Sequence, residues 1–193
     1  FFPIAEVGNA SSVLLGPGDD CAIQRIGPGL DLVFSVDALV EGVHFPHHYD
    51  PEKLGWRSLA VAASDLAAMG ADPVCFTLAL TLPDADPDWL SAYAHGLASA
   101  ARRFGLSLAG GDTTRGPLTL SMQVHGTVPK GGAILRSGAQ VGDYICVSGM
   151  LGEAGAALDH LENNDPGPDV QADVEAPVEA ETGDAVPAAP QSA

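Results

Sequence analysis

Four acidic residues lie in sequence surroundings that differ from an ordinary solvated surface. Asp20 ends the glycine turn 16–20, and Asp37 follows an apolar run. Asp65 lies within a segment rich in Ala and Leu, while Asp112 follows a pair of glycines. Carboxylate oxygens are hard ligands, which suit Mg²⁺ or Mn²⁺ and do not suit zinc. The four acids therefore predict a site for divalent ions.

Two of these acids have an equally simple explanation. Gly and Asp favour turns for backbone reasons alone, so segment 16–20 is also explained as a solvated turn. Asp37 follows the apolar run 32–36, and α/β proteins often place ligand groups at such a strand end. It could instead begin a turn. His44, seven residues later, brings an imidazole close to this acid in the sequence.

Asp65 is the sharpest candidate. From Leu59 to Met69 only Ser64 and Asp65 are polar, so we expect the carboxylate to be at least partly buried. Burying an ionised carboxylate is very costly unless it is paired or binds a metal. Arg57 lies eight positions back, too far to pair along one helix face. A metal ion, or an Arg from elsewhere, is therefore favoured.

The segment 110–116 has a different kind of chemistry. Its two glycines allow backbone N–H groups to approach a ligand oxygen closely, and Asp112 is expected to present its carboxylate at the end of a strand. The segment is not a Walker A loop, because G-x-x-x-x-G-K-[ST] is absent. By itself the motif is moderately specific.

Together the acids favour phosphoryl transfer. Carboxylates alone repel phosphates, but with bound divalent ions they hold phosphates and neutralise developing charge. Arg136 could donate to a phosphate, because its planar fork matches phosphate oxygens. Hydrolysis by a Ser or Cys nucleophile fits less well, because no such residue has an evident base partner.

Strand and helix signals alternate along the chain that carries these residues. We expect a helix from Leu54 to Met69 that stops at Gly70, and a second one from Pro87, capped by Asp86, to Phe104. A shorter helix is expected over 152–161. The apolar segments predict strands over 32–36, 74–80, 118–128 and 144–147, the first two of them buried. The expected fold is α/β (α+β), a mixed sheet covered by helices.

Charge and composition divide the chain. The net charge is −17, and all Lys and Arg precede residue 137, without the basic stripe of a nucleic-acid binder. Residues 161–193 are acidic and rich in Pro and Ala, so we expect a disordered tail after a domain spanning 1–160. No apolar run is long enough for a membrane span, and no secretory signal is visible. The three widely spaced cysteines suit a reducing cytoplasm.

Five motifs resemble those of a known family. Segments 18–22, 35–45, 64–73, 110–114 and 136–139 come in the order seen in thiamine-monophosphate kinases, which belong to the superfamily of aminoimidazole-ribonucleotide synthetase-like ATP-binding proteins. The resemblance runs from about Gly16 to Leu158. It implies the N-terminal ATP-binding domain of that superfamily and direct transfer of the ATP γ-phosphate to thiamine monophosphate, giving the diphosphate. It also implies several Mg²⁺ ions and a homodimer.

The resemblance also implies roles for individual residues. The implied Mg²⁺ ligands are Asp20, Ser35, Asp37, Asp65 and Asp112, with no catalytic residue beyond them. Gly111, Asp112 and Arg136 correspond to positions that contact ATP. His44 corresponds to a position that contacts thiamine monophosphate.

The resemblance stops where the family continues into a second domain, so we expect a truncated chain that contains half of the family's site. Two alternatives remain open. The chain could be a dimerising Mg–ATP-binding fragment without turnover. It could instead resemble another superfamily member, such as a selenophosphate synthetase or a purine-synthesis enzyme.

Overall fold

A computed structural model describes residues 12–147, 149 and 151–164, and its elements follow the alternation that the sequence predicts. In chain order they are β1 (Val13–Leu15), β2 (Ile23–Gln24), β3 (Leu30–Val40), α1 (Pro51–Ala68), β4 (Asp72–Leu82), α2 (Pro87–Phe104), β5 (Ser107–Arg115), β6 (Thr119–Pro129), the 3₁₀ turn η1 (Arg136–Gly138) and α3 (Glu153–Asn164).

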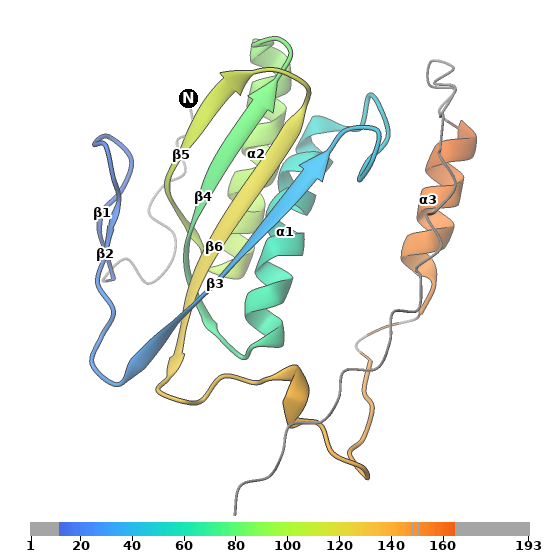
Figure 1. Ribbon diagram of the computed structural model, residues 1–193. Coiled ribbons are helices and arrows are strands. Elements are labelled where there is room, and N and C mark those ends of the chain that lie inside the picture. Colours follow the sequence, from blue (N-terminus) through green and yellow to red (C-terminus); the bar gives the residue numbers. More distant parts are fainter. Residues whose placement is uncertain (1–11, 148, 150, 165–193) are drawn as a thin grey trace, which may run out of the picture.

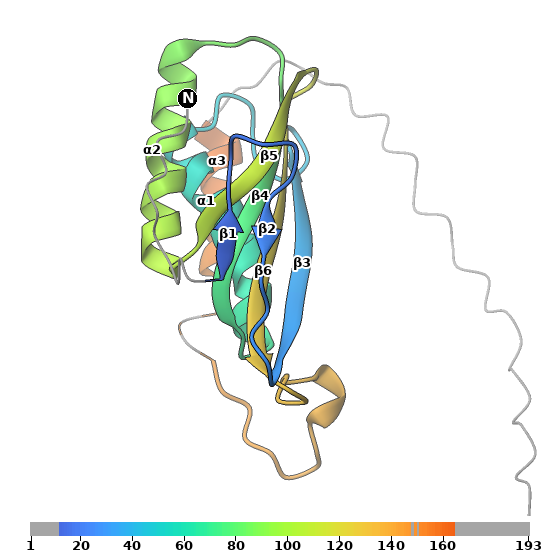
Figure 2. The ribbon, with the colours of Figure 1, turned by 90° about the vertical axis from the view of Figure 1, so that its left-hand side faces the viewer.

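The central feature is a four-stranded sheet of order β3-β6-β4-β5. β6 is antiparallel to both β3 and β4, whereas β4 and β5 run parallel with α2 as their crossover. Helices α1 and α2 lie together on one side of this sheet, as Figure 1 and Figure 2 show. The expected fold class, a mixed sheet covered by helices, is confirmed.

Both long helices begin and end at local signals. The Asp50 carboxylate accepts from the backbone N–H of Lys53 (2.9 Å) before α1, and Asp86 caps α2 in the same way. α2 has the predicted bounds and ends at Gly105, whose φ is 71°, a left-handed conformation that suits glycine. α1 begins three residues earlier than predicted, because Pro51 is its first residue.

The core lies between the sheet and the two helices. Its fully buried side chains alternate along β4 and β6 and recur along one face of each helix; the largest are Tyr93, Phe76, Leu54, Leu59, Leu66, Leu80, Leu97, Leu106, Leu120, Met122, Val124 and Val128. The helices meet at two glycines. A Cβ added at Gly55 would lie 2.1 Å from Tyr93 O, and one at Gly96 would lie 1.8 Å from Glu52 O. Only glycine permits this approach.

The opposite face of the sheet has no helix over it among the described residues. On β3 the outward side chains Leu32, Phe34 and Val36 are 40%, 61% and 61% exposed. The prediction of a buried strand over 32–36 is therefore right for the strand and wrong for its burial. β3 is an edge strand, and every second residue faces away from the core.

Three further predictions need correction. β5 continues to Arg115, so Gly110, Gly111 and Asp112 lie inside a strand and do not follow one. Segment 144–147 is not a strand, and Tyr144 and Ile145 are 96% and 98% exposed. α3 extends to Asn164, past its predicted end at 161. The predicted tail otherwise lies outside the described residues. None of the helices in the described part is long and apolar enough to cross a membrane.

Candidate functional site

Two of the predicted site residues meet where α1 packs beside β3. The Ser35 hydroxyl donates a hydrogen bond to Asp65 Oδ2 (2.5 Å), although 30 positions separate the two residues. Asp37 lies two residues further along β3 and therefore on the same face as Ser35. Between half-buried Val33 and buried Leu39, the β3 face toward the helices is thus polar. This polar edge of the core has three oxygen-bearing side chains.

Asp65 is exposed, so the expected partial burial of this carboxylate is wrong. The surrounding Ala residues misled the prediction, because Ala is accommodated on an exposed helix face as easily as in a core. Ala67 and Ala68 are exposed too, whereas Ala62, Ala63 and Leu66 point into the core. The burial cost that favoured a metal or an Arg at Asp65 therefore does not apply.

Asp20 lies in the loop between β1 and β2, outside the four-stranded sheet. Gly18 has φ 124°, and the backbone N–H of Asp20 donates to Asp19 Oδ1 (2.8 Å), so the segment forms the predicted turn. Both carboxylates are exposed. The loop begins beside β5, because a Cβ added at Gly16 would lie 4.0 Å from Leu108 O.

A polar cluster that the sequence did not indicate holds this two-stranded ribbon on the open face of the sheet. The Oε1 atom of Gln24 lies 2.9 Å from His125 Nδ1 and 3.8 Å from the sulfur of Cys75, so it accepts from the imidazole N–H and from the thiol. Burial lowers the pKa of His125 and raises that of the Cys75 thiol to about 11. Strand alternation could have placed His125 on this face, but nothing local could reveal a partner 101 residues away.

Asp112 lies on the open face of β5, opposite the exposed Ala79 of β4. Gly111 is required here for a packing reason: a Cβ at this position would lie 2.0 Å from Leu78 O. The glycine therefore allows β5 to approach β4 closely. A role in contacting a ligand through its backbone N–H, as the sequence suggested, would be additional to this one.

His44 is exposed in the turn after β3, and its ring orientation is fixed by the backbone. The N–H of Val40 donates to His44 Nδ1 (3.1 Å), so the neutral ring has its proton on Nε2. The Arg57 guanidinium donates to the His44 carbonyl (2.9 Å) and lies over the Tyr49 ring. The turn thus presents an N–H donor to solvent.

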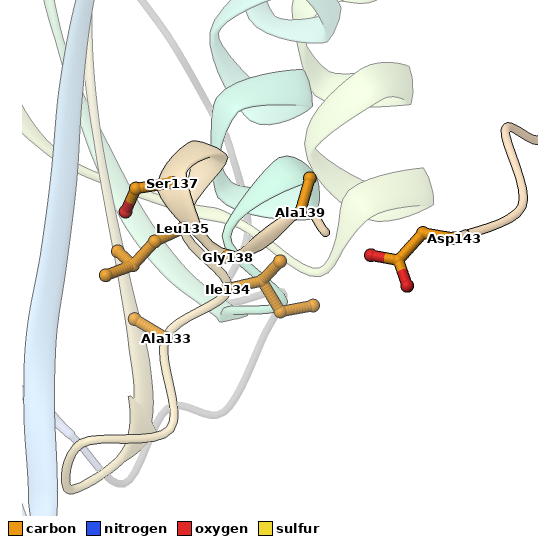
Figure 3. Close-up of a pocket in the computed structure, with 7 residues that line it drawn as sticks. All are labelled: Ala133, Ile134, Leu135, Ser137, Gly138, Ala139 and Asp143. Atoms are coloured by element: carbon orange, nitrogen blue, oxygen red, sulfur yellow. The ribbon is translucent and has the colours of Figure 1, made fainter. Parts of the chain in front are cut away.

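Arg136 begins η1, in the segment that follows β6. The backbone N–H of Ile134 donates to Met69 O (3.0 Å), which ties this segment to the end of α1, the helix that contains Asp65. The segment surrounds an open hollow of about 560 Å³ lined mostly by small and apolar residues (Figure 3), namely Ala133, Ile134, Leu135, Ser137, Gly138, Ala139 and Asp143. None of the four candidate acids lines it.

The structure therefore brings together part of the predicted set. Ser35, Asp37 and Asp65 share one edge of the core, while Asp20 and Asp112 lie elsewhere. Within the described residues, no three His, Cys, Asp or Glu side chains are close enough to hold a metal ion together. In the same part of the chain, no Lys, Arg or His nitrogen forms a salt bridge with any of these four acids. They present unneutralised hard oxygens, which fit Mg²⁺.

Known proteins resemble a large part of this chain. The thiamine-monophosphate kinase of Escherichia coli K12 is 50% identical over 151 residues, which are 78% of this chain and 46% of that protein. The crystal structure of thiamine-monophosphate kinase from Stenotrophomonas maltophilia K279a has a TM-score of 0.75 at 46% identity, over 80% of this chain and 49% of its own. AaThiL complexed with AMPPCP and TMP has a TM-score of 0.68 at 29% identity, over 74% of this chain and 46% of its own.

The resemblance to thiamine-monophosphate kinases is thus confirmed, and the chain spans about half the length of the relatives it matches. Residues 18–128 match the family model for AIR synthase related protein, N-terminal domain. This match covers more than half of the chain and includes β3, the two long helices and the sheet. The chain therefore belongs to the AIR synthase related protein family, through its N-terminal domain.

Proposed function

We propose that the protein phosphorylates thiamine monophosphate to thiamine diphosphate, using ATP and Mg²⁺ in a direct in-line transfer. The observation that carries the proposal is the 50% identity to a thiamine-monophosphate kinase over 151 residues of this chain. The ligands of AaThiL, AMPPCP and TMP, support ATP as the phosphoryl donor and thiamine monophosphate as the acceptor. The chain spans about half the length of these relatives.

The acids would hold the magnesium ions. Asp37, Asp65 and Ser35 at the core edge, with Asp20 and Asp112 from the ribbon loop and β5, form the proposed ligand set. The ions would supply charge neutralisation for the phosphates during transfer. The Ser35–Asp65 hydrogen bond supports the proposal, because it orients one carboxylate oxygen and leaves the other, Oδ1, available for an ion.

Three other residues would bind the two substrates. His44 would donate from Nε2–H to the phosphate of thiamine monophosphate, which its fixed tautomer allows. Arg136 would contact ATP phosphates through its guanidinium, and Gly111 would do so through its backbone N–H. We also propose that the protein is cytoplasmic and forms a homodimer. The exposed apolar side chains Phe34 and Val36 on the uncovered sheet face support the homodimer.

Neutralising Asp65 provides the first test. Asp65→Asn keeps the size of the side chain and removes its charge, so Mg²⁺-dependent binding of ATP should weaken by at least about 10-fold while the fold is retained. Calorimetric titration of ATP into the purified chain at fixed Mg²⁺ measures this change. Asp88→Asn is the matched control, because Asp88 is an exposed acid in the first turn of α2.

Formation of thiamine diphosphate separates the proposal from its main alternative. The chain is incubated with thiamine monophosphate, ATP and Mg²⁺, alone and with the separately expressed C-terminal part of the Escherichia coli kinase. Product in either mixture supports the kinase. Mg–ATP binding without product in both mixtures would instead identify a nucleotide-binding fragment that does not catalyse transfer. Unchanged Mg–ATP affinity in Asp65→Asn would remove Asp65 from the ligand set.

A further inference from the structure

The loop that contains Asp19 and Asp20 has little structure of its own. The strands that flank it, β1 and β2, have three and two residues, and their pairing is irregular between Val13 and Leu15. A ribbon of this size is not stable by itself in water. The loop must therefore take its position from whatever attaches the ribbon to the sheet.

Two anchors attach it, and they lie opposite each other. Val13 packs against the small buried cluster of Val74, Cys75 and Ala109. Gln24, the register partner of Val13, accepts from His125 of β6 and from the Cys75 thiol. Both anchors are at the base of the ribbon, and the loop with the two acids is at its other end.

The anchor formed by Gln24 depends on one well-formed contact. Gln24 Nε2 and His125 Nε2 are buried and, within the described residues, have no hydrogen-bond partner. The contact of Gln24 Oε1 with His125 Nδ1 (2.9 Å) is thus the one short polar bond between the two side chains, since the thiol contact is long at 3.8 Å. Removing either side chain's polar group would leave the other unsatisfied in a buried setting.

We propose that the hydrogen bond between Gln24 and His125 positions the Asp19–Asp20 loop. Gln24 and His125 are then positioning residues for the proposed metal site. The link to metal binding rests on the proposed function, whereas the attachment of the ribbon does not. Loss of the bond lets the ribbon leave the sheet, which moves Asp20 and uncovers Cys75. Gln24 and His125 touch no substrate in this proposal and act through the loop.

Cys75 reports on the ribbon without any added label. It is 3% exposed, whereas Cys146 is exposed, lies outside the ribbon and serves as an internal standard. The full chain is treated with iodoacetamide, and alkylation of each cysteine is followed by peptide mass spectrometry. Hydrogen exchange of the peptide spanning 16–22 measures the loop directly.

Three variants make the test specific. In Gln24→Leu the Cys75 alkylation rate should rise by about 5- to 10-fold relative to Cys146, and exchange over 16–22 should accelerate. Gln24→Glu retains an oxygen that accepts from His125 Nδ1–H and should restore protection. Arg25→Leu changes the adjacent exposed side chain and should match the unmodified protein, because the Arg25 contact to Ser12 is made by its backbone.

The outcomes test separately the attachment of the ribbon to the sheet and its effect on metal binding. Faster alkylation and exchange in Gln24→Leu, weaker Mg²⁺-dependent ATP binding in the same variant, and recovery of all three in Gln24→Glu support the proposal. Unchanged protection of Cys75 and of residues 16–22 in Gln24→Leu overturns the proposal. Faster alkylation and exchange together with unchanged Mg–ATP affinity also overturn it. If the unmodified chain bound no Mg–ATP, the proposed function would fail, and the alkylation and exchange data would still decide the positioning of the loop.

Discussion

The two faces of the sheet are made by the same four strands and yet differ in almost every property. Toward α1 and α2 the strands present side chains such as Phe76, Leu80, Leu120 and Val124, each of them 1% exposed or less. The other face presents Thr, Gln and His side chains of β6 and the exposed apolar residues of β3. Alternation along each strand divides the residues between the two faces.

The comparison teaches where function can be placed in such a domain. The covered face stabilises the fold through close packing, and a change there alters the whole domain. The residues proposed for chemistry lie at its boundary or beyond it: Ser35 and Asp65 at the β3 edge, and Asp112 on the open face. These positions can vary without unfolding the core, so their substitutions should separate binding from stability.

The largest expected effect comes from truncating an aromatic residue on each face. Phe76→Ala removes a fully buried ring and should cost about 3–5 kcal/mol of unfolding free energy, through lost burial and a cavity. Phe34→Ala, at a residue 61% exposed, should cost less than about 1 kcal/mol. Urea denaturation measures both.

Equal losses in these two variants would break the comparison between the faces. Measurements at several protein concentrations test the difference between the two faces further. If a second copy covers Phe34, as the proposed homodimer requires, the effect of Phe34→Ala on the melting temperature should change with protein concentration, while that of Phe76→Ala should not.

The contact between the two helices should give the next largest effect. In Gly96→Ala the new methyl group would meet the Glu52 carbonyl oxygen at 1.8 Å, so the helices must separate, at a cost of about 2–3 kcal/mol. Gly155→Ala is the control, because nothing lies within 4 Å of its added Cβ. Thermal unfolding followed by circular dichroism compares the two, and a Gly96→Ala protein as stable as the control would contradict the close packing.

The smallest expected effect is the pH dependence of stability that His125 causes on the open face of the sheet. Burial lowers the pKa of His125 below its ordinary 6.5, so the unfolded chain binds a proton more readily than the folded one. The stability contribution of neutral His125 is therefore complete above about pH 6.5 and declines as the pH falls toward the lower folded pKa, by at most about 1.4 kcal/mol per pH unit. The group that contacts the cluster from β4, Cys75, stays neutral throughout this range because its pKa is raised to about 11.

Urea denaturation at several pH values between 5 and 7.5 isolates this contribution. His125→Gln should show a shallower loss of unfolding free energy on acidification than the unmodified protein, since the other ionisable groups are the same in both. Parallel curves for the two proteins would show that the His125 imidazole does not titrate differently in the folded state.

The sequence predicted those parts of the fold that depend on local signals. Asp86, Pro87 and Gly105 define α2 because capping and left-handed conformations act within a few residues. Segment 144–147 was wrongly predicted as a strand, because an apolar run forms one only where a partner strand exists, and a partner is not a local property. β5 extends through Gly110 and Gly111 because β4 pairs with them.

For the candidate site the sequence identified residue types and missed their environment. Ser35 and Asp65 do meet, whereas the expected burial of Asp65 is wrong, because Ala content does not determine which helix face is covered. The Gln24–His125 contact depends on where a short ribbon docks on the sheet. The assignments of metal and substrate ligands remain predictions.

The irregular pairing of β5 has a consequence for how this gene can change length. Phe76 pairs with Leu108 and Thr77 with Gly110, so Ala109 is an extra residue without a partner. After this bulge, Asp112 faces away from the helices, opposite Ala79. Deleting a single codon at this bulge would remove the extra residue and leave Asp112 opposite Ala79, on the same face of the sheet. A one-residue deletion should therefore be tolerated better at this bulge than in the regular ladder, where it would turn every following side chain to the other face.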